Sequence, residues 1–297
     1  MPRGALSPAP SRHDLELEPC DIEILAYIQS NKFITTRLFH KRFLPNKSYM
    51  TACTHLKDLV DRGLLLKTQK LPCEDTFFYL TRPAIRQLYA LARILVSREV
   101  RSPHINIYER EHDKRVIQMR IQIEAESALA NLTWLSDYEM RCGLKMDWKK
   151  ALQEGRGWDL SKAKLHRFHH RTPDGYFEAT IEGASYTFVL EYEHTPYKRE
   201  KMAAMVLNLN YNFPGVVKLI VSRDKDHAIR MARGLVGYLR ANPRELPLWA
   251  FSFYQKVANL PFTRVPWATL EGKYLPFVKD PIMTKDRPEA DSDEVNS

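Results

Sequence analysis

The sequence predicts a mixed α/β protein composed of two domains. A length of 297 residues is typical of two domains rather than one. Hydrophobic residues make up 44% of the chain, which is enough to form real cores and excludes a wholly disordered protein. Residues 19–95 read as three helices, a β-hairpin and a fourth helix, and the later part of the chain reads as α–β–β–β–α–β–α–β.

Composition along the chain sets the expected domain limits. Residues 1–18 are rich in Pro, Ser and charge, and residues 282–297 are polar and acidic, so we expect both segments to be disordered. We expect an N-terminal domain at 19–97, a polar linker at 98–115 and a second domain at 116–281.

Net charge, hydropathy and cysteine spacing indicate the cellular compartment of the protein and the kind of partner that it binds. The formal net charge of +9 favours a polyanionic partner. No apolar run approaches the roughly 18–20 residues that span a bilayer, and residues 1–11 lack the apolar segment of a secretory signal. The four cysteines are scattered without C-x-x-C spacing, so we expect unpaired thiols and no zinc site. A cytoplasmic protein without membrane insertion is therefore predicted.

Helical spacing of hydrophobic residues predicts three helices between residues 19 and 63. Thr35 or Thr36 can cap the second helix and Ser48 the third, because a hydroxyl at this position accepts a hydrogen bond from an unpaired backbone N–H. Gly63 is typical of the residue that follows a helix C-terminus. The hydrophobic positions that define the three helices are Ile22, Leu25, Ile28, Leu38, Phe39, Phe43, Ala52, Leu56, Leu59 and Val60.

A hairpin and a fourth helix follow. Two β-rich runs, 64–70 and 76–80, flank a polar break at 72–75. The segment that begins at Thr81 then opens a helix with Pro83 in its first turn.

This order of elements, together with the sequence LKDLVDRGLL at residues 56–65, closely resembles a winged-helix domain. Nine Lys and Arg stand against two Asp over residues 32–70, a net charge of +7. In winged-helix proteins the third helix enters the major groove and the wing contacts phosphates, although some members use the fold for protein contacts instead. The resemblance implies DNA binding by Lys41, Arg42, Lys47, Ser48, Tyr49, Thr54, Lys57, Lys67 and Lys70.

The second domain is expected to begin with a long helix and a basic segment. Hydrophobic spacing predicts a helix from about 113 to 141, with Ile117, Ile121, Ala125, Ala128 and Leu132 on one face. Residues 143–163 are basic and irregular. Over 145–171, eight Lys and Arg stand against three acids, so we expect a phosphate-contacting strip that includes Arg171.

Three carboxylates are predicted to meet at the open end of a second hairpin. Tyr176–Ile181 and Ser185–Tyr192 are β-rich, with a Gly-containing turn between them. If the turn is 182–183, Asp174 faces Glu191; if it is 183–184, Asp174 faces Glu193. Glu191 and Glu193 share one face of their strand in both cases. Opposed carboxylates repel, and a hard divalent cation would relieve that repulsion. The alternative is that these acids are solvated at a frayed strand end.

The elements after this hairpin complete the domain. Thr195 and Pro196 predict the start of a helix that runs to about Tyr211 and carries Lys198 and Lys201 in its first turns. A buried strand at 215–222, a helix at 225–240 and a second buried strand at 248–254 follow.

Element order and carboxylate spacing together resemble the restriction-endonuclease-like PD-(D/E)xK core. Pro173-Asp174 and Glu191-x-Glu193 occupy the places of its Pro-Asp and Asp/Glu-x-Lys motifs, with Glu193 where Lys is usual. The resemblance implies that Asp174 and Glu191 bind Mg²⁺ or Mn²⁺ for phosphodiester cleavage. Some endonucleases of this fold carry Glu at that place, which would make Glu193 catalytic, and others carry the Lys on the following helix, where Lys198 or Lys201 would serve. The accessory acids that the resemblance implies, on the preceding helix, are Glu124 and Glu126, with Glu139 a weaker candidate; solvated surface acids are the alternative.

A winged helix followed by such a core resembles the replication-relaxation family and the endonuclease-type relaxases of mobilisable plasmids, over roughly residues 20–270. The resemblance implies a protein that binds double-stranded DNA at a plasmid origin and nicks it with a metal ion, alongside a relaxosome accessory or coupling protein. The alternative is a non-catalytic regulator of replication or mobilisation. His166, His169 and His170 are weaker candidates, for metal binding or for assistance by His170.

Overall fold

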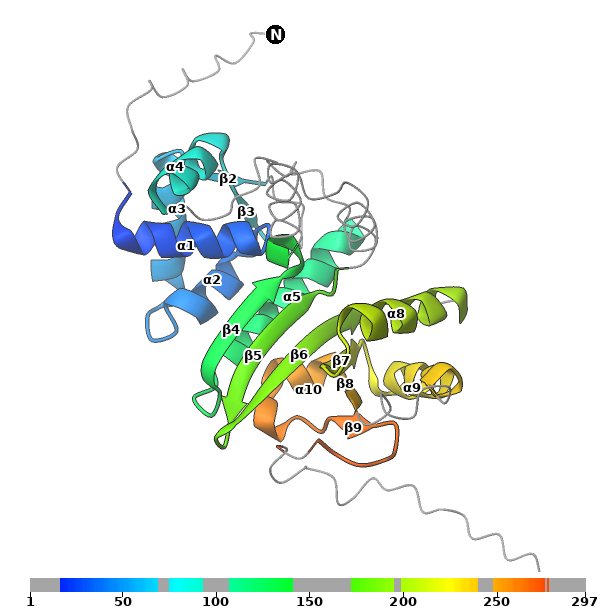
Figure 1. Ribbon diagram of the computed structural model, residues 1–297. Coiled ribbons are helices and arrows are strands. Elements are labelled where there is room, and N and C mark those ends of the chain that lie inside the picture. The colour runs from blue at the N-terminus through cyan, green and yellow to red at the C-terminus, as the bar shows by residue number, and fades with distance from the viewer. Residues whose placement is uncertain are drawn as a thin grey trace, which may run out of the picture. The chain divides into compact units, whose positions relative to one another are not determined.

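The computed structural model describes residues 17–68, 75–92, 107–140, 172–194, 199–239, 248–275 and 277 (Figure 1). The chain divides into two compact units. The first comprises Met1–Ile121 and Leu135–Thr172, and the second comprises Gln122–Trp134 and Pro173–Ser297. Lys70, Arg171, Lys198, the three histidines at 166–170 and the basic segment 143–163 lie outside the described residues.

The first unit has the predicted order of helices and hairpin, with one additional short strand. β1 joins β3, so that three strands form an antiparallel sheet in the order β1-β3-β2. The elements are α1 Pro19–Ser30, β1 Ile34–Thr35, α2 Thr36–Phe43, α3 Tyr49–Asp61, β2 Leu65–Lys67, β3 Phe77–Leu80, α4 Arg82–Ala92 and α5 Ile107–Glu124, whose last three residues belong to the second unit.

The predicted caps set the limits of these helices. The Thr35 hydroxyl accepts a hydrogen bond from the backbone N–H of Leu38 at 3.3 Å, and Ser48 accepts one from Thr51 at 3.2 Å. Gly63 has a φ of 73°, which is a left-handed conformation that glycine adopts without strain. Helix ends are therefore determined locally, by residues within a few positions of each other.

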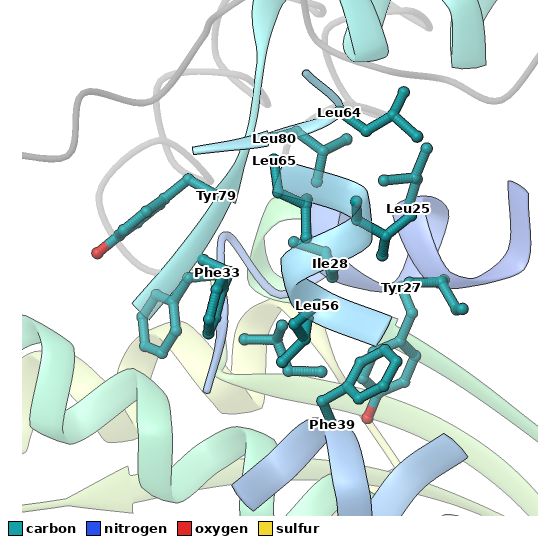
Figure 2. Packing of buried hydrophobic residues seen from close by; sticks show 14 of the residues in the cluster. Leu25, Tyr27, Ile28, Phe33, Phe39, Leu56, Leu64, Leu65, Tyr79 and Leu80 are labelled. Atoms are coloured by element: carbon teal, nitrogen blue, oxygen red, sulfur yellow. The ribbon is translucent and has the colours of Figure 1, made fainter. Parts of the chain in front are cut away.

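The core of the first unit is formed where the helices meet the small sheet. Figure 2 shows Leu25 and Ile28 of α1 packed with Phe39 of α2 and Leu56 of α3, all fully buried. Phe33 meets the ring of Phe77 edge-on, with centroids 5.0 Å apart. These contacts join residues from every part of 24–88, which stabilises the helical order that the sequence predicts.

Two basic residues of the predicted DNA-binding stretch lie inside ion pairs. Lys32 binds Asp113 at 2.9 Å and Asp137 at 3.3 Å, and Arg62 binds the buried Asp21 at 2.6 Å. Their charges are neutralised within the unit. The cationic surface of residues 32–70 is therefore smaller than the sequence suggests.

α5 differs from the prediction at both ends. It begins at Ile107, so residues 107–115 are helical rather than part of a linker. Arg120 of this helix donates to Ser30 at 3.1 Å and to Asn31 at 3.3 Å, and its guanidinium lies 4.7 Å from the Tyr27 ring centroid. Within the predicted linker, Asp113 pairs with Lys32 at 2.9 Å, and a contact with a residue 81 positions earlier cannot be predicted from polar composition.

The predicted continuation of this helix to residue 141 is wrong. The helix ends at Glu124, and β4 spans Ala130–Ser136. Ala125 and Ala128, expected on the buried face, are exposed. Trp134 is instead buried at strand spacing and stacks on Phe177 with ring centroids 5.1 Å apart. The short apolar run fits both a helix and a strand, and the packing of Trp134 on Phe177 across the sheet favours the strand.

The second unit contains a six-stranded mixed sheet in the order β4-β5-β6-β7-β8-β9. β5 and β6 are antiparallel, whereas β6, β7 and β8 are parallel neighbours. The α/β class is therefore confirmed. The elements are β5 Gly175–Ile181, β6 Ala184–Glu193, α8 Arg199–Asn212, β7 Val217–Ser222, α9 Lys225–Leu239, β8 Trp249–Phe253, α10 Tyr254–Asn259 and β9 Ala268–Thr269.

α8 and α9 pack against one face of this sheet (Figure 1). Val189, Ile220 and Phe251, from three neighbouring strands, form a buried cluster with Met205 of α8 and Met231 of α9. Because paired residues of neighbouring strands share a face, Glu191 and Glu193 lie on this helix-covered side. No described helix has the length and apolar character needed to cross a membrane.

Candidate functional site

The third helix of the first unit has one face in the core and one in solvent. Ala52, Leu56 and Leu59 are fully buried. On the opposite side, Tyr49 is 52% exposed and Met50 is 70% exposed. The other exposed residues of this helix and of the turn before it are Pro45, Asn46, Lys47, Ser48, Thr51, Thr54, Lys57, Asp58 and Asp61.

The predicted DNA-binding residues divide into exposed and packed groups. Lys67 is exposed on β2, next to the 48% exposed Leu66. Arg42 is half-buried, and its guanidinium lies 5.2 Å from the ring centroid of Tyr27. Burial lowers the pKa of Lys41. Lys41 and Arg42 therefore contribute to packing, whereas Lys47, Lys57 and Lys67 present their charge to solvent.

The turn between α2 and α3 is held by a residue that sequence reasoning missed. A ring nitrogen of His40, Nε2, lies 2.7 Å from the backbone carbonyl oxygen of Lys47. The His40 ring also meets the ring of Tyr49 edge-on at 5.9 Å. His40 thereby fixes the start of α3 relative to α2. Its polar character alone gave no indication of this contact.

The register of the second hairpin settles the choice of turn. Gly175 pairs with Leu190 and Ile181 with Ala184, so Glu182 and Gly183 form the two-residue turn. Both have positive φ, 51° and 83°, as a type I′ turn requires. This is the first of the two predicted registers, and it places Asp174 opposite Glu191 at the end of the ladder.

The three acids at this corner have different environments. Oδ2 of Asp174 accepts a hydrogen bond from the backbone N–H of Tyr192 at 2.8 Å. Asp174 and Glu191 are half-buried, whereas Glu193 is only 3% exposed. Within the described residues, no group of three or more His, Cys, Asp or Glu is arranged to hold a metal ion. The structure thus holds Asp174 against the backbone of β6 next to Glu191 and leaves Glu193 in the interior.

The other candidate acids and lysines have separate roles. Glu126 accepts hydrogen bonds from the backbone N–H of Thr263, at 3.2 Å, and from its hydroxyl, which ties the end of α5 to the 3₁₀ helix Phe262–Arg264. Glu124 is half-buried at the end of α5. Glu139 accepts from the backbone N–H of Ser136 at 2.8 Å. Lys201 is exposed in the first turns of α8.

A second buried polar group lies at the start of α9, and sequence reasoning missed it. His227 is 1% exposed, and Ser222, the last residue of β7, is fully buried. Within the part of the chain that the structure describes, the two ring nitrogens of His227 and the Ser222 hydroxyl have no hydrogen-bond partner. Burial lowers the pKa of His227; Asp224 opposes this, and Arg230, Arg223 and His194 add to it. His227 is therefore a neutral imidazole at neutral pH.

Comparison of the chain with protein-family models, with curated proteins and with solved structures finds no match.

Proposed function

We propose that this protein binds duplex DNA through the first unit, with α3 in the major groove and the β2–β3 hairpin beside it. The exposed face of α3 carries the proposal, because a capped helix presents Lys, Thr, Tyr and Met side chains outward from a rigid core. The three-stranded sheet in the order β1-β3-β2 supports a winged helix, since it anchors the hairpin to the helices.

The charge distribution supports contact with phosphates. Lys47 precedes α3, Lys57 lies on it and Lys67 lies on β2, and all three are exposed. Each lysine that neutralises a phosphate releases a counterion, so the affinity depends steeply on salt. Lys32 and Arg62 are already paired inside the unit and are not expected to contribute.

The test compares Lys57→Ala with Arg86→Ala in the full chain. Arg86 is an exposed residue of α4, a helix that packs on α1, so its replacement removes the same charge elsewhere in the unit. Fluorescence anisotropy with a labelled duplex should show that Lys57→Ala weakens binding and lowers the log–log salt slope by about 1. Arg86→Ala should match the wild type. Equal affinities and slopes for all three proteins would refute binding through this face.

Strand nicking is a second candidate, favoured by the hairpin register. Asp174 and Glu191 stand opposite each other, and carboxylates of this kind suit Mg²⁺ or Mn²⁺, which bind to one or two carboxylates together with phosphate oxygens. The order α5-β4-β5-β6-α8-β7 supports a restriction-endonuclease-like core. Asp174 and Glu191 would hold the ion, and the bound ion would activate water and stabilise charge on the cleaved phosphodiester.

Asp174→Asn separates this enzyme from a non-catalytic regulator. Asn retains an oxygen that can accept the Tyr192 N–H but lacks the charge that binds a metal ion. With supercoiled plasmid and Mg²⁺ or Mn²⁺, the wild type should give open circles, and Asp174→Asn should lose this activity while it still binds DNA. Glu178→Gln, an exposed acid on the same strand, is the matched control. Equal nicking by the wild type and Asp174→Asn, or none by the wild type, excludes cleavage at this corner.

We propose a plasmid origin as the DNA target of this protein. A plasmid origin is the DNA that the replication-relaxation resemblance implies, and a relaxosome accessory or coupling protein is the protein partner it implies. Recovery of plasmid fragments bound to the full chain tests this, because origin fragments should be enriched over the rest of the same plasmid.

A further inference from the structure

The exposed end of α3 is unusually apolar for a surface that is proposed to meet DNA. Met50 is 70% exposed and Tyr49 is 52% exposed, both in the first turn of the helix. Exposed hydrophobic side chains are hydrated unfavourably. A partner that buries Tyr49 and Met50 would therefore gain binding free energy. Lys47, just before the helix, and Lys57, in its third turn, favour an anionic partner, and the exposed acids Asp58 and Asp61 are confined to the last turn.

The threonines beside Met50 have their hydroxyl groups occupied within the helix. The Thr54 hydroxyl donates to the backbone carbonyl of Met50 at 3.1 Å. The Thr51 hydroxyl is 2.9 Å from the hydroxyl of Ser48, which also accepts the Thr51 N–H. Thr51 and Thr54 are exposed, so each offers a partner its methyl group beside a hydroxyl oxygen that can still accept a hydrogen bond.

The helix lacks the side chains that read purines with two hydrogen bonds. α3 has the sequence YMTACTHLKDLVD, which contains no Arg, Asn or Gln. Those residues are the usual bidentate readers of guanine and adenine in the major groove. Lys57 is the one Lys of the helix and can donate to guanine O6 or N7. The thymine C5-methyl is the groove feature that apolar side chains and threonine methyl groups recognise.

We propose that α3 reads thymine methyl groups, through Met50 with Thr51 and Thr54, next to a guanine contacted by Lys57. The inference rests on the proposed DNA binding by the first unit and names the base chemistry of its target. Met50 is the specificity-determining residue, because it is the most exposed apolar side chain of the helix. Sites for this protein contain A·T pairs in the half of the recognised sequence that faces the start of α3.

Replacing thymine by uracil tests this directly, because it removes only the C5-methyl group. The full chain is used to select bound duplexes from a randomised pool, and the selected duplex is remade with deoxyuridine in place of thymidine. Anisotropy should show about fivefold weaker binding of the uracil duplex, the effect of one or two methyl groups lost from an apolar contact. In Met50→Ala, binding of the thymine duplex should weaken and the thymine-to-uracil ratio should fall towards one.

Lys57→Ala is the matched control for Met50→Ala. It should weaken binding to both duplexes equally and retain the wild-type thymine-to-uracil ratio, since it removes a charge but no methyl contact. Met50→Leu, which keeps an apolar side chain, should retain most of the ratio. Unchanged melting temperatures confirm that the variants fold, as expected for exposed positions.

The outcomes separate this inference from the function on which it rests. Equal affinity of the wild type for thymine and uracil duplexes, or a selection without A·T enrichment, overturns methyl reading but leaves DNA binding intact. Failure to bind any duplex overturns both. An unchanged ratio in Met50→Ala overturns the assignment of Met50, even if the wild type prefers thymine.

Discussion

His227 illustrates how a single buried residue links stability to pH. His227 is 1% exposed, and neither of its ring nitrogens has a hydrogen-bond partner among the described residues. An unpaired buried polar group costs about 1–3 kcal/mol, and a protonated one costs more. Burial therefore lowers the pKa of His227 below its ordinary value of 6.5, with Asp224 opposing the shift. In the unfolded chain the same imidazole takes up a proton freely near that value.

The sign of the pH effect follows from this difference. As pH falls through 6.5, the unfolded state binds a proton that folded His227 does not, so the free energy of unfolding decreases. We expect His227→Leu to stay within about 1 kcal/mol of the wild type at pH 8, because Leu fills the site without an unpaired polar atom. Urea unfolding from pH 8 to 5.5 should show a smaller loss of stability in the variant. Parallel pH profiles for the two proteins would contradict this account.

At the scale of single elements, the hairpin turn is determined by its own residues. Glu182 and Gly183 both have positive φ, and the resulting type I′ twist matches that of the strands. This is why the sequence could limit the register to two choices. The choice between the two registers is made by the pairing of the strands. In the observed register Phe177 pairs with Phe188, and both rings are fully buried.

Alanine substitutions at two glycines test whether local backbone conformation determines the stability of an element, and the two are expected to change stability in opposite directions. A methyl group added at Gly183 or at Gly237 would meet no other atom within 4 Å, so only backbone conformation differs between the two positions. Gly183→Ala should destabilise the protein by about 1 kcal/mol, because φ is +83°. Gly237→Ala, inside α9, should stabilise it by about 0.5–1 kcal/mol. Thermal unfolding measures both, and a shift of the same sign in both variants would contradict this explanation.

Between α5 and β4, local sequence did not predict the secondary structure correctly. Ile117 and Ile121 are buried at helical spacing as predicted, but Trp134 is buried because Phe177 of another strand covers it. The run from Ala125 to Leu132 fits a helix as well as a strand when it is considered alone. Only contact with residues about 45 positions away makes the strand the lower free-energy choice.

At the scale of the whole molecule, net charge overstates the positive charge on the surface proposed to bind DNA. Ion pairs within the first unit occupy Lys32 and Arg62, and packing occupies Arg42. Of the DNA-binding lysines predicted within 32–70, those both described and exposed are Lys47, Lys57 and Lys67. The formal charge of +9 arises in the first unit, which carries 29 Lys and Arg against 18 Asp and Glu, whereas the second unit carries 16 against 18.

Two triple variants test whether DNA binding depends on the charge of the α3 face or on the net charge of the whole chain. Replacing Lys47, Lys57 and Lys67 by Ala should lower the log–log salt slope of DNA binding by about 3. Replacing Lys225, Arg230 and Arg233, which are exposed on α9 of the second unit, removes the same charge and should leave the slope unchanged. Equal losses in both triple variants would show that the overall charge, rather than the α3 face, holds the DNA.

The sequence by itself determined the features that depend on residues close together in the chain. The Thr35 and Ser48 caps, the left-handed Gly63 and the placement of Glu191 and Glu193 on one face follow from local hydrogen bonding and strand periodicity. Tertiary structure alone decided which charges are internal, that Glu193 is buried and that Asp174 accepts the Tyr192 N–H. The physical reason is that burial and ion pairing depend on distant partners, as in Lys32 and Asp113, which lie 81 residues apart.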